Sequence, residues 1–306
     1  MSSTPFFRKP QAIRPGDRVC VIAPAGPFDR ESFDAGMAPI AERYHATYDE
    51  HLFDRYRYLA GDDSRRLAEW ASALQDPQIK AIFCARGGYG TLRLLPHLAA
   101  LQPSRPAKAL VGFSDITALH QWLQCQGVVS IHGPVVTQLG RQAQPARDRL
   151  FSLLESTVPA APLSGTHTYV GGKAQGPLLG GNLSVFTRLL GTPFLPPLDG
   201  AILLLEDVGE RPYSLDRMWT HLTLAGVFRK VAGIVLGSFS GCEEKSADYT
   251  SEAVLRDLAV ATGLPCAAGF PIGHTDLNEP VPLGARVRLD ADSRRLEFLE
   301  AAVSEQ

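Results

Sequence analysis

The chain alternates between short hydrophobic runs and stretches in which hydrophobic residues recur every three or four positions. The first pattern predicts buried strands, and the second predicts helices with one buried face. Strands are expected at residues 18–24, 47–52, 79–84, 109–113 and 128–131, and helices at 31–44, 62–74, 91–98 and 116–123. Because strands and helices follow each other in turn, the first half is expected to be an α/β domain with a parallel sheet.

The alternation weakens between about residues 138 and 176, where glycine and proline are frequent. We therefore expect an N-terminal domain at residues 1–140, a linker at 141–176 and a smaller C-terminal α/β domain at 177–306. In the second domain, strands are expected at 201–206, 231–236 and 265–270, a hairpin at 285–290 and 295–299, and helices at 182–190, 215–225 and 252–262. We expect its core to be a mixed sheet or barrel-like.

Composition and charge narrow the classes of function. The 306 residues are 45% hydrophobic and carry a formal net charge of −2, which is typical of a globular protein and argues against a nucleic-acid or anionic-membrane partner. No stretch is apolar for long enough to span a membrane, and the N-terminus lacks the hydrophobic region of a signal peptide, so a cytoplasmic location is expected. The five cysteines are scattered and are expected to be free. Neither metal-ligand spacing nor a nucleotide-binding glycine motif is present, so we expect no metal and no cofactor.

A serine stands where the strand 109–113 meets the helix 116–123. A tight strand-to-helix turn exposes a serine Oγ above the free N–H groups of the helix start, as acyl transfer requires. Ser114 is therefore a candidate nucleophile, although Ser114 or Asp115 could instead only cap the helix. The pattern G-x-S-x-G is half met, because Ile116 replaces the second glycine.

A nucleophilic serine needs a general base, and four histidines are candidates for it. His274 lies in the loop FPIGHTDLNEP outside any helical stripe, which favours it, although it could simply be an exposed loop residue. His132 follows a strand and precedes Gly-Pro, so it could line the same crevice. His120 is expected to point away from the serine turn, and His221 is expected on the surface or boundary of a helix.

The base in turn needs an acceptor that fixes its tautomer. Glu206 ends the hydrophobic run 201–205, so its charge is expected to be half-buried and to need a partner. An imidazole N–H is one such partner. The alternatives are an ion pair with Arg211 or Arg217, or transfer of the role to Asp207.

Eight short segments, spread over nearly the whole chain, share one resemblance. In order they are VIAPAGP, ARGGYG, VGFSDITALH, IHGP, GGNLSVFTRLLGTP, LLLEDVGERPYSLDRMWTHL, GIVLGSF and GFPIGHTDLNEPVPLGARVRLD. Together they resemble the LD-carboxypeptidases, serine peptidases also called muramoyltetrapeptide carboxypeptidases. The resemblance implies an N-terminal α/β domain that carries the nucleophile and a C-terminal domain that supplies a glutamate and a histidine. On this sequence those roles fall on Ser114, Glu206 and His274.

The resemblance also implies removal of the terminal D-alanine from murein tetrapeptides, at a bond between an L-centre and a D-residue. It implies work in the cytoplasm during cell-wall recycling, as a homodimer. We expect the backbone N–H groups of Asp115 and Gly88 to hold the oxyanion, and Arg86 to hold the free carboxylate of the substrate.

Two other functions remain as alternatives. Microcin C self-immunity peptidases, from the same family, cleave aminoacyl- or peptidyl-nucleotides and would need an aromatic platform in a loop of the catalytic domain. The loop 241–249 offers only Tyr249 for this purpose. A non-catalytic binding protein is the alternative from another class, and it would have no use for a base-activated serine.

Overall fold

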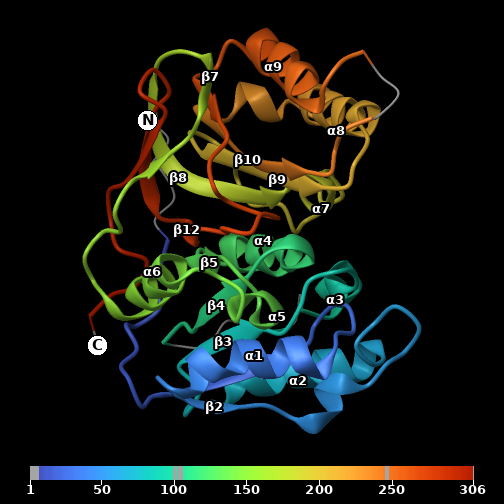
Figure 1. Cartoon of the computed structure of the whole chain (residues 1–306), viewed down its shortest axis with the longest axis vertical. Coiled ribbons are helices and arrows are strands. Elements are labelled where there is room, and N and C mark those ends of the chain that lie inside the picture. The colour runs from blue at the N-terminus through green and yellow to red at the C-terminus, as the bar shows by residue number, and fades with distance from the viewer. Residues whose placement is uncertain (1–6, 99–100, 102–105, 245–247, 306) are drawn as a thin grey trace.

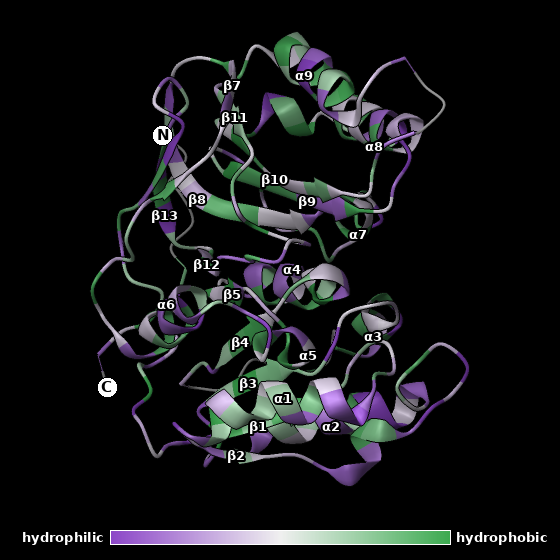
Figure 2. Cartoon of the chain, viewed as in Figure 1, coloured by the Kyte–Doolittle hydropathy of each residue, from purple (hydrophilic) through white to green (hydrophobic). Residues whose placement is uncertain are grey.

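The computed structural model describes residues 7–98, 101, 106–244 and 248–305. The chain forms two halves that lie one above the other, each built on a β-sheet (Figure 1). Hydrophobic residues gather on the strands inside both halves, whereas the outer helices carry many hydrophilic ones (Figure 2). Two parts of the sequence interpretation fall partly outside the described residues, namely the extreme N-terminus at 1–6 and the loop 241–249 at 245–247.

The first half is built on a six-stranded sheet, counted over the described residues, in the order β12-β5-β4-β3-β1-β2. All neighbouring strands are parallel except β12, which is antiparallel to β5. The predicted parallel α/β fold is therefore confirmed for this half. The strands are β1 (Arg18–Ile22), β2 (His45–Thr47), β3 (Ala81–Cys84), β4 (Ala109–Gly112), β5 (Ser130–His132) and β12 (Val281–Leu283).

Alternate residues of these strands point to opposite faces of the sheet, so two separate cores form. Phe83 and Val111 face a core that is completed by α1, α5 and α6. Ile82 and Leu110 face the other core, which is completed by α2, α3 and α4. The helices are α1 (Arg30–Ala41), α2 (Asp63–Gln75), α3 (Thr91–Leu98), α4 (Thr117–Cys125), α5 (Val136–Leu139) and α6 (Gln144–Glu155).

The second half is built on an eight-stranded mixed sheet, again among the residues described, in the order β6-β14-β13-β8-β9-β10-β11-β7. The sheet curls into a half-barrel whose concave side is filled by residues such as Leu178, Leu204 and Leu289, as the sequence led us to expect. Helices α7 (Leu183–Thr187), α8 (Pro212–Leu224) and α9 (Ser251–Thr262) cover its other side. The strands are β6 (Leu163–Ser164), β7 (His167–Val170), β8 (Lys173–Asn182), β9 (Ile202–Val208), β10 (Gly233–Ser240), β11 (Cys266–Ala268), β13 (Arg286–Asp290) and β14 (Arg295–Phe298).

The predicted strand at 47–52 is wrong. Strand β2 ends at Thr47, and the chain then enters a 3₁₀ turn at Glu50–Phe53. The carboxylate of Asp49 accepts the backbone N–H of His51 at 2.9 Å, which favours this turn over an extended chain. The hydrophobic character of the segment comes from anchoring this turn to the core, since Leu52 is fully buried.

The segment expected to be a linker, 141–176, contains helix α6, strands β6 and β7 and the start of β8. Leu150 and Leu154 of α6 pack in the core of the first half. Strands β6 and β7 lie at the two ends of the second sheet and are largely exposed, which explains why they leave a weak hydrophobic pattern. The domain limits themselves stay a prediction.

Strand β12 joins the two halves. It belongs to the C-terminal part of the chain but pairs with β5, and Val281 lies opposite His132. Because β12 runs antiparallel to β5, the residues that precede it emerge where the parallel strands of the first sheet end. The two ends of the chain also connect the halves. Phe7, near the N-terminus, packs in the second half, and Val303, near the C-terminus, packs in the first (Figure 1).

Candidate active site

Ser114 lies at a sharp turn between β4 and α4. Its φ angle is 64°, and a 3₁₀ turn at Ser114–Ile116 leads into the helix. Positive φ is strained for a residue with a side chain, and among the described non-glycine residues only Arg57 and Arg294 share it. Ser114 is half-buried, whereas both of its neighbours in the chain are buried. The turn thus presents the serine at the C-terminal edge of the sheet, as expected of a nucleophile.

Three side chains that are far apart in the sequence meet at this turn. The Nε2 atom of His274 lies 3.1 Å from Oγ of Ser114. Its other ring nitrogen, Nδ1, lies 2.7 Å from Oε2 of Glu206. Ser114 follows β4, Glu206 lies on β9, and His274 lies in the segment between β11 and β12. The arrangement is that of a nucleophile, a base and an orienting carboxylate, which can carry out acyl transfer.

The backbone around His274 is fitted closely to Glu206. Gly273 has a φ angle of 109°, and a Cβ atom at this position would lie 2.4 Å from Oε2 of Glu206. The side chain of the buried Asn278 accepts the Gly273 N–H at 2.8 Å, and the Asn278 N–H donates to Gln142 at 3.0 Å. Glycine at position 273 and these hydrogen bonds therefore fix the loop that presents His274. The sequence interpretation missed Asn278, whose only signal was its place in the same loop.

Glu206 is ionised in spite of complete burial. Burial alone would raise the pKa of this carboxyl, but the neighbouring imidazoles of His132 and His274 outweigh it and lower the pKa to about 2. A carboxylate that stays charged favours the Nδ1–H tautomer of His274, and this tautomer leaves Nε2 free to accept a proton from Ser114.

The glycine loop after β3 lies directly against the serine. The Gly26 N–H donates to the Gly87 carbonyl at 2.9 Å. A Cβ atom on Gly87 would lie 2.8 Å from Cβ and 3.0 Å from Oγ of Ser114, so only glycine allows this approach. The next residue, Gly88, has a φ angle of 105°, in the region that favours glycine. The backbone of this loop is thereby brought next to Ser114.

The side chain of Asp115 ties the serine turn to the same loop. Its Oδ2 accepts both the backbone N–H and the hydroxyl of Thr91 at 2.8 Å, at the first residue of α3. Burial raises the pKa of Asp115 to about 6 against the lowering effect of these hydrogen bonds. The sequence interpretation assigned only the backbone N–H of Asp115, and the preference of aspartate for helix starts was the one signal for its side chain.

We expect Gly87→Ala to lower kcat by about 100-fold or more while KM changes little, because the new methyl group must displace the Ser114 side chain. Steady-state kinetics with circular dichroism as a folding check would measure this. Gly16→Ala is the control for destabilisation alone, since its positive φ makes alanine strained there while the new Cβ meets nothing within 4 Å. Native kcat in Gly87→Ala would mean that the loop can retreat without affecting the serine.

Of the four candidate histidines, His274 is the one that reaches Ser114. The fully buried His120 has Nε2 2.8 Å from the Gly112 carbonyl and Nδ1 2.8 Å from a serine hydroxyl. Burial lowers the pKa of His120 to about 3, so it is a neutral structural residue. His221 is exposed on α8, as expected.

The alternative partners of Glu206 are engaged elsewhere. Arg211 pairs with Glu244 at 3.8 Å, and Arg217 donates to a serine hydroxyl. Asp207 accepts hydrogen bonds from an asparagine side chain and from a backbone N–H of α7. The structure therefore favours the imidazole over an arginine as the partner of Glu206.

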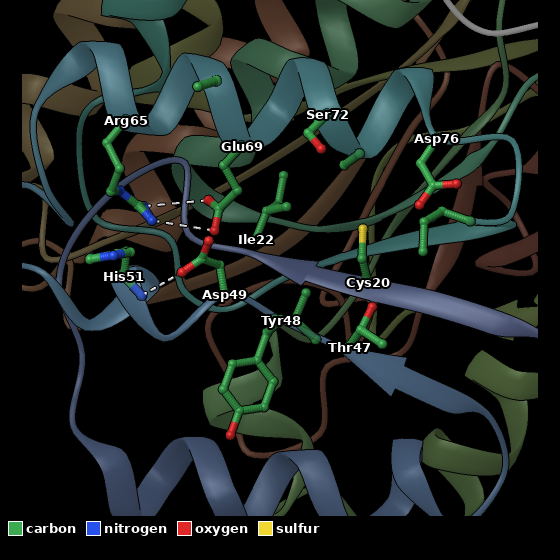
Figure 3. A pocket seen from close by; sticks show the side chains of 14 residues that line it. Cys20, Ile22, Thr47, Tyr48, Asp49, His51, Arg65, Glu69, Ser72 and Asp76 are labelled. Atoms are coloured by element: carbon green, nitrogen blue, oxygen red, sulfur yellow. Dashed lines mark hydrogen bonds and ion pairs between the residues drawn. The ribbon is translucent and has the colours of Figure 1, made fainter.

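A cavity of about 540 Å³ lies apart from these three side chains, between α2 and the strands β1 and β2 (Figure 3). Arg65 and Glu69 line it, and both hold the backbone of Ala23. Arg65 donates to the Ala23 carbonyl at 2.9 Å, and the Ala23 N–H donates to Glu69 at 2.8 Å. Burial raises the pKa of Glu69 to about 7. Because Ala23 leads into the loop that contacts Gly87, the wall of this cavity supports the candidate site.

The described residues contain no group of histidine, cysteine and acidic side chains arranged to hold a metal ion. All five cysteines are free, and four of them are buried. Within the same part of the chain, no helix combines the length and the apolar character needed to cross a membrane.

Sequence comparisons identify relatives along almost the full length of the chain. The LD-carboxypeptidase N-terminal domain matches residues 19–133, and the LD-carboxypeptidase C-terminal domain matches residues 175–289. A putative carboxypeptidase of Synechocystis is 40% identical, and the match covers 98% of this chain and 100% of the relative. A probable murein peptide carboxypeptidase of Bacillus subtilis is 37% identical (97% and 96% covered). The murein tetrapeptide carboxypeptidase of Pseudomonas aeruginosa is 35% identical (91% and 94% covered).

Structural comparisons agree with this assignment. A muramoyltetrapeptide carboxypeptidase from Oxalobacter formigenes superposes with a TM-score of 0.82 at 26% identity, over 94% of this chain and 100% of that one. The microcin C7 self-immunity protein MccF superposes with a TM-score of 0.84 at 21% identity, over 97% and 99%, which establishes a common fold. The predicted family is thus confirmed: this chain belongs to the LD-carboxypeptidase family and is a serine-type LD-carboxypeptidase.

Proposed function

We propose that this enzyme removes the terminal D-alanine from murein tetrapeptides by a Ser-His-Glu acyl-enzyme mechanism. The observation that carries the mechanism is the chain of contacts from Ser114 through His274 to the buried Glu206. The substrate class is supported by relatives named for murein peptides, which are similar to this chain over more than 90% of its length.

In this mechanism, Nε2 of His274 takes the proton of Ser114 while Oγ attacks the carbonyl carbon of the scissile bond. Glu206 holds the imidazole and stabilises its positive charge. The backbone N–H groups of Asp115 and Gly88 hold the oxyanion. His274 then gives the proton to the departing amine of D-alanine. Water, deprotonated by the same histidine, hydrolyses the acyl-enzyme and restores the serine.

Arg86 is our candidate for the group that holds the free carboxylate of the substrate. It is exposed at the start of the glycine loop, and one of its guanidinium nitrogens donates to the Pro27 carbonyl. The guanidinium has five N–H donors, so this contact leaves others available for a carboxylate.

We further propose a cytoplasmic role in the recycling of cell-wall peptides. The five free cysteines support a reducing compartment, because disulfides form mainly in oxidising ones. A homodimer is what the family resemblance implies, and it stays a prediction.

The proposal is tested by incubating the protein with a murein tetrapeptide that ends in D-alanine and analysing the products by mass spectrometry. We expect loss of one alanine, and no loss from the same peptide ending in L-alanine. Turnover of an aminoacyl-nucleotide in place of the tetrapeptide would instead support the microcin-type alternative. In that case the exposed Tyr249 would be the aromatic side chain on which the nucleobase stacks. Turnover of neither substrate would contradict the proposed substrate class.

A further inference from the structure

A second histidine lies against the carboxylate of the candidate triad. His132 is at the end of β5, and both His132 and Glu206 are completely buried. The Nε2 atom of His132 lies 3.9 Å from Oε1 of Glu206, whereas His274 contacts the other oxygen, Oε2. Each oxygen of the carboxylate therefore has one imidazole near it.

The facing atoms of this pair lack other partners. Oε1 of Glu206 and both ring nitrogens of His132 are buried without any hydrogen bond to the described residues. A buried polar atom without a partner is costly, and a buried charged oxygen is more so. An imidazole N–H and a carboxylate oxygen that both lack a partner and lie 3.9 Å apart form a hydrogen bond of ordinary length if they move about 1 Å closer.

Among the described polar groups around His132, Glu206 is the one with an oxygen that still lacks a hydrogen bond. The ring of Phe113 lies 5.7 Å from the ring of His132 and 4.6 Å from that of His274, so it packs against both imidazoles. The ring of His120, from α4, is 6.4 Å away, and its own nitrogens are occupied. Asp207 is the further charged group next to Glu206, and its carboxylate is hydrogen-bonded elsewhere.

We propose that His132 is a positioning residue of the hydrolytic site, which donates its Nε2–H to Oε1 of Glu206 and so holds Oε2 on Nδ1 of His274. This inference rests on the mechanism proposed above. With a donor at each oxygen, the carboxylate cannot rotate about its terminal bond and stays ionised. The pairing of β5 with β12 sets the spacing, because Val281 lies opposite His132 and the same connection carries His274.

The test compares two variants of this residue. His132→Leu fills the space without a donor, whereas His132→Gln keeps an N–H donor near the place of Nε2. For His132→Leu we expect kcat to fall by about 10- to 100-fold with KM nearly unchanged, and for His132→Gln we expect most of kcat to be kept. His120→Gln is the matched control, because it alters the neighbouring buried histidine that makes no contact with Glu206.

The pH profile separates positioning from mere packing. Loss of a donor leaves more negative charge on the Glu206 carboxylate, and this favours the protonated form of the His274 imidazole that it contacts. Because protonated His274 cannot accept the Ser114 proton, the acid limb of kcat/KM should move to higher pH in His132→Leu and stay in place in His132→Gln and His120→Gln. If both His132 variants lose the same activity with an unshifted limb, or if His132→Leu behaves as the native enzyme, the proposal is wrong.

A measurement without substrate keeps the two proposals distinguishable. The ¹³C signal of the Glu206 carboxyl, identified by its absence in Glu206→Gln, reports its ionisation directly. We expect the pKa of Glu206, about 2 in the native protein, to rise by at least about one unit in His132→Leu only. An unchanged titration would overturn the role of His132 even if the tetrapeptide is hydrolysed, and a shifted one would support it even if the tetrapeptide is not.

Discussion

Replacing Ser114 by alanine should lower kcat/KM for the tetrapeptide by about 10⁴-fold or more, which is the largest effect expected in this protein. The reason is that Oγ is the atom 3.1 Å from Nε2 of His274, and no other group at the turn can form the acyl-enzyme. Alanine changes the side chain by one atom and keeps the backbone of a non-glycine residue with positive φ. The fold should therefore survive, and the loss should appear in kcat.

The measurement is product formation followed by mass spectrometry, with a serine-directed fluorophosphonate probe as a second readout. The native protein should be labelled and Ser114→Ala should not. Ser72→Ala, an exposed serine of α2, is the matched control and should keep full activity. Turnover by Ser114→Ala at the native rate, or labelling that survives this substitution, would contradict the serine mechanism.

The second large effect is expected for Glu206→Gln, with a fall of about 10³- to 10⁴-fold in kcat. An amide can donate a hydrogen bond to Nδ1 of His274, and this stabilises the tautomer whose proton sits on Nε2. In that tautomer the atom facing Ser114 carries a hydrogen and cannot accept the serine proton. The size and burial of the side chain are conserved, so the loss is one of chemistry more than of fold. Steady-state kinetics at neutral pH would measure it.

The pH dependence of stability provides the control for this variant. The pKa of Glu206 is lowered from 4.5 to about 2, so between these values the unfolded chain binds more protons than the folded one. The stabilisation from the paired carboxylate is thus fully present above pH 4.5 and lost as the pH falls toward about 2. Urea unfolding should show the advantage of the native protein over Glu206→Gln shrinking between about pH 5 and pH 3. An advantage that is constant or grows on acidification would show that the carboxylate is not held ionised.

The sequence predicted the first half of the fold well because buried parallel strands appear in it as short, continuous hydrophobic runs. The runs ending at Cys84 and Gly112 are hydrophobic at every position, since each residue faces one core or the other. The strand predicted at 47–52 was wrong because the buried hydrophobic residue of this segment, Leu52, belongs to a 3₁₀ turn and not to a strand. The strands in 141–176 were missed because edge strands bury little and have no strong period.

The candidate site was predictable residue by residue only with the family resemblance. From the local sequence alone, Ser114 could have been a helix cap, Glu206 an ion-pair partner and His274 an exposed loop residue. Their spacing in the chain does not show that they lie together. The segment that carries His274 reaches the edge with Ser114 through a long-range pairing, between β12 and β5, which the local pattern does not specify. The place of His132 depends on the same pairing, so its contact with Glu206 could not be read from the motif IHGP.

Strand β12 also determines when a growing chain can acquire activity. The serine turn is complete once α4 has been made, but the proposed base, His274, is held by a strand that ends at Leu283. Until then β5 has an open edge and Ser114 has no partner. If Ser114 is the nucleophile, as proposed, synthesis from the N-terminus makes it before its base. Strand β12 then both closes the sheet edge against other chains and brings in the base.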